Sequence, residues 1–229
     1  MLQPKKKISK REIKQDKLVT RAMQAEAWAL ENKKTLTYGG MALIAIVVVL
    51  FVWNDRRSAA EVESSTRLAR ILPVYDQGNY QQAIDGVASE GTFGLKSIVD
   101  EYGGTNAGQL AHLYFANALA ALGKYAEASD IYEDISVDDR LVMASAAAGQ
   151  ARCYEGLERY KEAGGAYERA ASTDPKNPLA PDRLFSAAVN FKHAGMKEEA
   201  REALATMRKL YPTSSYARDM ARYEAEFAS

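Results

Sequence analysis

The sequence contains one cysteine, Cys153, and two histidines, His112 and His193, among its 229 residues. A single thiol excludes an intramolecular disulfide and any metal cluster built on several cysteines. Neither histidine has a His, Asp or Glu partner at the spacing of a metal site, so we expect both to lie on helix surfaces. Cys153 lies in a helical pattern, where a small buried hydrophobic residue is the ordinary interpretation.

Signatures of catalysis are also lacking. The sequence holds no glycine-rich phosphate loop, no nucleophile elbow and no zinc motif. One acidic pair, Asp138 and Asp139, lies between expected helices, where helix capping explains it better than paired-carboxylate catalysis. We therefore predict that the protein is not an enzyme and that it uses no cofactor and no metal.

Net charge is absent as well, because 30 Lys and Arg residues balance 30 Asp and Glu residues. Overall charge therefore gives no reason to expect nucleic acid as a partner. The charges are unevenly distributed, since residues 1–35 carry an excess of roughly six positive charges that the remainder balances. This asymmetry indicates that the two parts of the chain lie in different environments.

One long stretch has no charged residue at all. Leu36 to Trp53 reads LTYGGMALIAIVVVLFVW, and its length as a helix nearly matches the roughly 30 Å of a bilayer's hydrocarbon core. Tyr38 and Trp53 lie near its ends, where amphipathic rings prefer the headgroup level. We predict a single transmembrane helix at residues 35–54 that contacts lipid from Leu36 to Trp53. A cleaved signal peptide is the alternative, but a charged DRR sequence follows where small residues would be needed.

The Lys- and Arg-rich residues 1–34 predict a cytosolic N-terminal tail, so residues 55–229 are expected on the other side of the membrane. The tail is expected to be partly helical, because residues 5–32 lack glycine and proline and are rich in helix formers. Two interpretations stay open for it. It is either a helix that binds anionic lipid or a partner, or a solvated tail that only sets topology.

A motif of the form Gly-x-aromatic-x-x-Ala repeats along the rest of the chain. It is complete twice, while the third copy has Glu158 in place of glycine and the fourth has Lys197 in place of the aromatic residue. The copies begin at positions 78, 123, 158 and 195, with spacings of roughly 45, 35 and 37 residues. These spacings are close to the 34-residue unit of tetratricopeptide repeats (TPRs), so the segment from about residue 58 resembles a TPR array.

The repeat pattern predicts an all-α fold. It comprises the transmembrane helix and a TPR-like α-solenoid of about four helix pairs. Antiparallel helix pairs need small residues where their backbones approach and glycine where the turn requires positive φ. In the last three copies the small residue precedes the turn by seven positions, as Ala116, Ala151 and Ala188. We place repeats at about 58–90, 109–140, 144–178 and 181–213, an insertion with a helix near 95–102 at 91–108, and a cap helix at 214–229.

Stacked helix pairs form a concave groove that suits an extended peptide or a partner helix. The register of the first helices places eight residues on this lining: Leu113, Tyr114, Asn117, Arg152, Glu155, Phe185, Val189 and Lys192. In peptide-binding TPR proteins an Asn at the place of Asn117 hydrogen-bonds the ligand backbone. A tolerated polar residue is the alternative interpretation. Leu113 occupies a place where the carboxylate clamp of that family has a cation, which argues against capture of a C-terminal carboxylate.

A basic tail, one membrane span and a TPR domain together resemble the YfgM-like family of ancillary proteins of the bacterial Sec translocon. The phrase DEYGGTNAGQLAHLYFANALAALGKYAEASDIYEDI, residues 100–135, is most similar to its Bacteroidetes and Chlorobi members. The resemblance implies an inner-membrane protein with a periplasmic domain. It also implies three kinds of partner: SecYEG, a PpiD-like membrane chaperone and exported polypeptides. A structural subunit of a larger membrane complex and an envelope-assembly adaptor unrelated to Sec are the alternatives.

Overall fold

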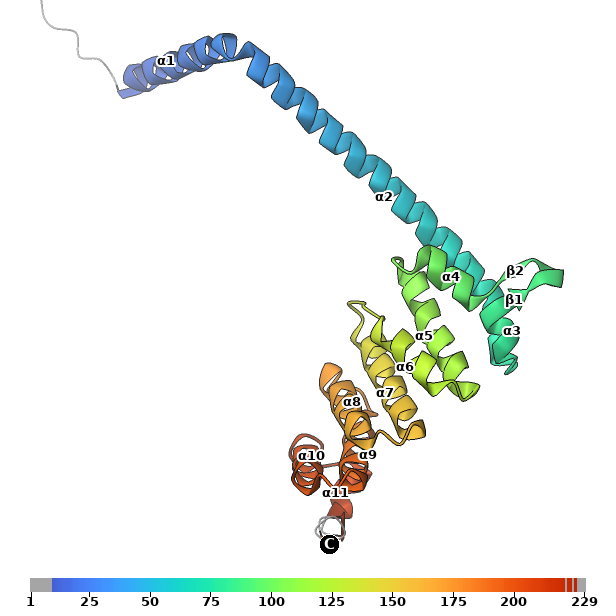
Figure 1. Ribbon diagram of the computed structural model, residues 1–229. Coiled ribbons are helices and arrows are strands. Elements are labelled where there is room, and N and C mark those ends of the chain that lie inside the picture. Colours follow the sequence, from blue (N-terminus) through green and yellow to red (C-terminus); the bar gives the residue numbers. More distant parts are fainter. Residues whose placement is uncertain (1–9, 221, 224, 226–229) are drawn as a thin grey trace, which may run out of the picture. The chain divides into compact units, whose positions relative to one another are not determined.

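The protein is almost entirely helical (Figure 1). The computed structural model describes residues 10–220, 222, 223 and 225. The chain divides into two compact units, Met1–Arg56 and Arg57–Ser229. The first unit holds α1 (Lys10–Glu31) and the N-terminal part of α2 (Lys33–Asp76), and the second holds the repeat array.

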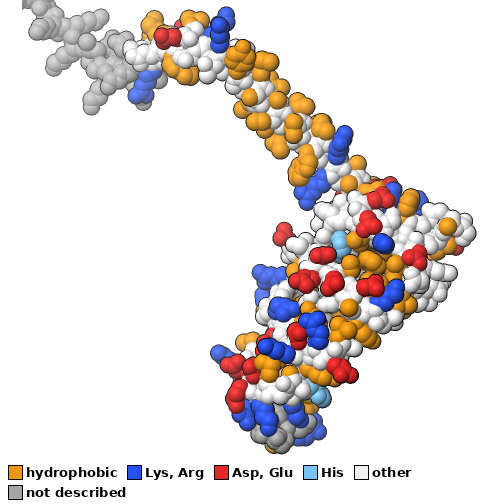
Figure 2. All heavy atoms as spheres, viewed as in Figure 1, with side chains coloured by type: hydrophobic (Ala, Val, Ile, Leu, Met, Phe, Trp, Pro, Cys, Tyr) orange, Lys and Arg blue, Asp and Glu red, His pale blue; other side chains and the backbone are white. Residues whose placement is uncertain are grey.

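The apolar stretch of α2 exposes its side chains all round the helix. Large residues such as Leu43, Val49 and Phe51 are more than half exposed, and Figure 2 shows hydrophobic side chains along this segment. Within the described residues, α2 is the helix that is long and apolar enough to cross a membrane, and none of its apolar window is buried in the protein. A helix that is apolar on every side and unburied fits lipid better than water. α1 occupies the part of the tail expected to be helical, whereas residues 1–9 lie outside the described part of the chain.

The first repeat departs from an ordinary helix pair. α2 continues past the apolar stretch to Asp76, and Pro73 lies in its last turn without ending it. α3 (Tyr80–Asp85) has only six residues. It leads into a hairpin that the sequence did not predict, made of β1 (Gly86–Val87), the 3₁₀ helix η1 (Ala88–Glu90) and the antiparallel β2 (Thr92–Phe93). α4 (Leu95–Tyr102) follows, where a helix was expected in the insertion.

In the described part of the chain, three regular helix pairs complete the array (Figure 1). They are α5 (Asn106–Ala121) with α6 (Tyr125–Glu133), α7 (Arg140–Gly156) with α8 (Tyr160–Thr173), and α9 (Ala180–His193) with α10 (Lys197–Leu210). α7 packs on both α6 and α8, and α9 packs on both α8 and α10. This stacking confirms the all-α, TPR-like solenoid. α11 (Ser215–Arg218) lies in the predicted cap, part of which lies outside the described residues.

The turn inside each pair has the same backbone conformation. Gly78, Gly123 and Gly195 have φ between 76° and 79°, and Glu158 has φ 58° at the equivalent place. After Gly123, the Lys124 N–H donates to the carbonyl of Leu119, and equivalent bonds follow the other three residues. This pattern is the Schellman motif, whose left-handed residue favours glycine. The expected need for positive φ at the repeated glycine is therefore confirmed.

Small residues and aromatic rings alternate in the core. Ala116, Ala151 and Ala188 are fully buried, in agreement with the sequence pattern. Tyr132 of α6 packs so closely on Gly149 of α7 that a Cβ atom there would collide with the ring. One hydrophobic cluster joins the C-terminal part of α2 to helices α3 to α7, and a second spans α7 to α11. The array is thus held by close helix approach rather than by large aliphatic layers.

The start of α5 is held by the C-terminal part of α2. The Glu61 carboxylate accepts the backbone N–H groups of Asn106 and Ala107 at 2.8 and 2.9 Å. The Ser64 hydroxyl lies 3.0 Å from the hydroxyl of Thr105, which caps α5 by accepting the Gly108 N–H. These bonds satisfy backbone donors that a helix N-terminus otherwise leaves unpaired.

Candidate peptide-binding groove

Two neighbouring cavities of about 530 and 550 Å³ open on one face of the array. The first is lined by residues of α5, α7, α8 and α9, and the second by residues of α2, α3, α5, α6 and α7. Asn117 of α5 and Arg152 of α7 line both cavities. We call these two cavities together the groove. It crosses several repeats, as a site for an extended chain must.

Five of the eight residues expected on the lining meet in the groove. Leu113, Tyr114, Asn117 and Arg152 line the first cavity, and Glu155 lines the second with Asn117 and Arg152. All five belong to α5 and α7. The register of these two helices therefore places the expected side chains together.

The three residues expected on α9 line neither cavity. Phe185 stacks on Tyr216 at 4.6 Å and lies 4.7 Å from the ring of Tyr223, so the C-terminal segment covers it. Val189 packs against the second hydrophobic cluster, and Lys192 is half-buried. α9 instead contributes Asp182, Arg183 and Ser186 to the first cavity, about one turn earlier than expected.

Asn117 is fixed by a neighbour in the array. The Tyr132 hydroxyl donates to its Oδ1 at 2.5 Å. Burial raises the pKa of Tyr132, which keeps this donor protonated. The amide nitrogen of Asn117 has no hydrogen-bond acceptor among the described residues. A donor is thus left for an occupant of the groove, in line with the peptide-binding interpretation of Asn117.

Glu155 connects neighbouring helices in the wall of the groove. Its carboxylate accepts the Tyr167 hydroxyl at 3.0 Å and the Asn190 side-chain amide at 2.6 Å. The pKa of Tyr167 is raised, first by burial and then by the negative charge of Glu155. The carboxylate therefore ties α7 to α8 and α9.

Two arginines give the groove positive charge. Arg152 is exposed, and among the described residues no carboxylate forms an ion pair with it. Arg183 is only 6% exposed, and its Nη1 donates to the Ala170 carbonyl at 3.2 Å. Burial lowers the pKa of Arg183, while the charge of Asp174 opposes this effect. Sequence reasoning missed Arg183 because a buried arginine leaves no periodic signal that separates it from a surface one.

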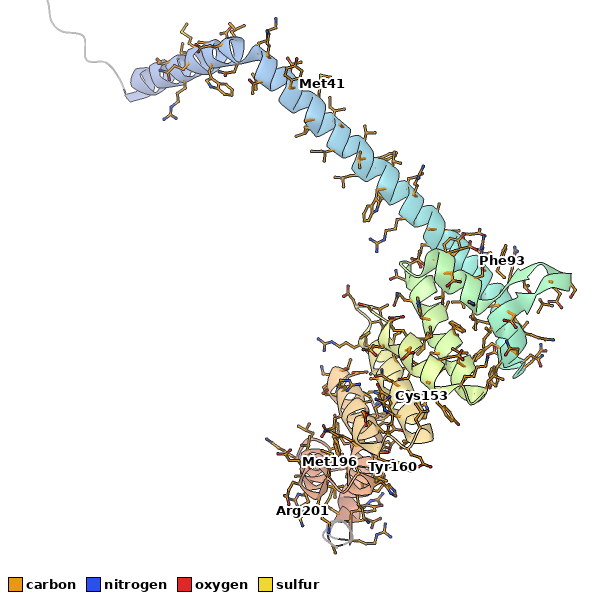
Figure 3. The ribbon with its side chains drawn as sticks, viewed as in Figure 1. Met41, Phe93, Cys153, Tyr160, Met196 and Arg201 are labelled. Carbon is orange, nitrogen blue, oxygen red and sulfur yellow. The ribbon has the colours of Figure 1, made fainter. Side chains whose placement is uncertain are left out.

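Cys153 forms part of the wall of the second cavity and not a reactive centre. It projects from α7 (Figure 3), is fully buried, and burial raises the pKa of its thiol to about 11. A protonated, inaccessible thiol is a poor nucleophile. Asp139 caps α7 by accepting the N–H groups of Leu141 and Val142, as expected from its position.

The histidines lie apart on different helices. The His112 ring is half-buried, with Nδ1 3.1 Å from the Gly108 carbonyl. His193 is exposed beside the ring of Tyr160. In the described part of the chain, no three His, Cys, Asp or Glu side chains gather as a metal site would require.

The family model of the coatomer epsilon subunit matches residues 95–229. The chain belongs to this family. The coatomer epsilon match begins at α4 and includes all eight residues expected on the groove. The family is all-helical and TPR-like, which supports a repeat protein that binds other proteins. A comparison with curated proteins finds no match.

Proposed function

We propose that the protein is a membrane-anchored adaptor whose groove binds an extended segment of a partner protein. The groove carries this proposal, because Asn117 and Arg152 present a hydrogen-bond donor and a cation to one continuous surface across three repeats. Backbone-directed donors give affinity for any extended chain, and side-chain pockets beside them give selectivity. Membership of a TPR-like family supports a role in protein interaction.

The place of action proposed is the bacterial inner membrane, with the N-terminus cytoplasmic and the repeat domain periplasmic. The apolar helix and the basic tail support this topology. The likeness to YfgM-like proteins supports assistance to protein export at the Sec translocon, with SecYEG, a PpiD-like chaperone and exported polypeptides as partners.

Photo-crosslinking from the groove in intact membranes tests both levels of the proposal. Leu179 lines the first cavity and is 53% exposed, whereas Leu141 is 56% exposed and lines neither cavity. Each is replaced in turn by benzoylphenylalanine. We expect translocon components, a membrane chaperone and exported chains to be crosslinked from position 179 and not from 141. Equal products from both positions would refute binding in the groove, and specific partners without any Sec connection would refute only the export role.

A second candidate is a structural subunit that clamps neighbouring proteins of a larger complex. The family description favours it, because coatomer epsilon is itself named as a subunit. It predicts one fixed partner crosslinked from position 179 at constant stoichiometry, whereas an export adaptor gives many products. An envelope-assembly adaptor without Sec partners would give specific crosslinked products at position 179, and these products would contain neither translocon components nor exported chains.

A further inference from the structure

The Arg152 guanidinium lies where the two cavities of the groove meet. Glu155 lies three residues further along α7, but its oxygens accept hydrogen bonds from Tyr167 and Asn190 and form no ion pair with Arg152 among the described residues. Asp182 also lines the first cavity, next to Arg183 in the sequence, and it accepts a hydrogen bond from the Tyr216 hydroxyl. Arg152 therefore offers the groove a positive charge that the described residues leave unpaired.

Tyrosine rings surround this charge. Tyr75 makes edge-to-face contacts with Tyr80 at 5.3 Å and with Tyr114 at 5.0 Å. Tyr125 and Tyr132 add to the wall of the second cavity. Such rings bury apolar area at low entropic cost. Arg152 itself is exposed, so the rings add apolar contact beside an ion pair that forms in contact with water.

We infer that the occupant of the groove is an internal, extended polypeptide segment that pairs an Asp or Glu side chain with Arg152. This inference rests on the proposed function and specifies the chemistry of the partner. A carboxylate matches the planar guanidinium and accepts two parallel hydrogen bonds from it. The Asn117 amide nitrogen donates to a backbone carbonyl of the same segment, and apolar side chains beside the carboxylate lie on the tyrosine rings.

The charges of the groove exclude other segments. A Lys or Arg side chain at this place would face both Arg152 and Arg183, and like charges close together are unfavourable. A C-terminal carboxylate would need a cation one turn before Asn117 on α5, but Leu113 stands there, and Arg183 is buried with its Nη1 bound to the Ala170 carbonyl. An internal Asp or Glu side chain needs only the Arg152 guanidinium as its ion-pair partner.

Selection from a displayed library of random 12-residue peptides tests this inference on the full chain in phosphatidylcholine nanodiscs. The same selection is run on Arg152→Glu and on the matched variant Arg140→Glu. Arg140 is exposed, lies on the same helix and lines neither cavity. Far-UV circular dichroism verifies that each variant is folded. Binding of selected peptides is then measured by fluorescence anisotropy.

We expect peptides enriched in Asp or Glu at one position, and a Kd at least about tenfold weaker for Arg152→Glu but unchanged for Arg140→Glu. Arg152→Lys keeps the charge and should retain more affinity than Arg152→Glu. Peptides selected by Arg152→Glu should carry Lys or Arg at the same position. If peptides bind the groove but show no acidic preference, the inference fails and the adaptor proposal stands. If the selection yields no peptide that binds the groove, the adaptor proposal fails as well.

Discussion

Glu158 is the one non-glycine residue with positive φ among the described residues, and it occupies a place that glycine takes in the other three repeat turns. Its side chain is exposed and has no hydrogen bond or ion pair with the described residues. We therefore predict that Glu158→Gly stabilises the protein, because it removes backbone strain without removing a contact.

The size of the effect follows from two opposing contributions. A left-handed conformation costs a residue with a Cβ atom about 1–2 kcal/mol, while glycine adds about 0.5–1 kcal/mol of conformational entropy to the unfolded chain. The net gain is about 0.5–1 kcal/mol. For a unit of this size, 1 kcal/mol shifts the unfolding midpoint by about 2–4 °C. We therefore expect the midpoint to rise by about 1–4 °C.

Thermal unfolding of the full chain in mild detergent, followed at 222 nm, measures the change. The reverse substitution, Gly123→Glu, provides the matched comparison, because Gly123 has φ 76° and no atom within 4 Å of the place a Cβ would take. Only the backbone is therefore perturbed, and the midpoint should fall by a similar amount. A midpoint that is unchanged or lower in Glu158→Gly would refute the strain argument.

Three further predictions concern the packing, the helix cap and the buried thiol. Gly149→Ala drives a methyl group into the Tyr132 ring and should cost about 1–3 kcal/mol of unfolding free energy, whereas Gly165→Ala, which meets only a distant side-chain atom, should be neutral or stabilising in the same melt. Glu61→Gln weakens a charge-assisted cap on α5 and should lower the unfolding free energy by about 1–2 kcal/mol, and an unchanged melt would contradict this role. Cys153 should react slowly with iodoacetamide at pH 8 and faster as the pH approaches 11, because its raised pKa leaves little thiolate below that value. Labelling as fast as in urea-unfolded protein would contradict burial.

The repeat architecture could be predicted from the sequence because its signals are local. The Schellman turn depends on a few neighbouring residues, so the glycines at 78, 123 and 195 mark three of the turns. The regular spacing of the repeat then locates the fourth turn, where Glu158 stands in place of glycine. The helix α4 also follows from local signals, since glycine-rich turns flank it. The β1–β2 hairpin escaped prediction because two-residue strands are too short to show alternation.

The groove could be predicted only in part. On α5 and α7 the helical period places Asn117 and Arg152 on the same face, and the structure brings them together. On α9 the expected Phe185 is covered by Tyr216 and Tyr223, a contact between distant segments that no local pattern encodes. Tyr167 belongs to α8, the second helix of its pair, whereas the residues expected on the lining all came from first helices. It lines the first cavity and donates a hydrogen bond to Glu155. Such residues become visible only once the packing is known.

The hydrophobic cluster that joins α2 to α5 has a practical consequence for shortened versions of the protein. Leu68 and Ile71 of α2 lie with Phe115 and Leu119 of α5 in one core, although the family match begins only at residue 95. A fragment that begins at that boundary would expose the apolar side of α5 to water. The first N–H groups of α5 would also lose their hydrogen bonds to the Glu61 carboxylate. A fragment of the repeat array made for expression should therefore begin near Arg57, where the second compact unit begins.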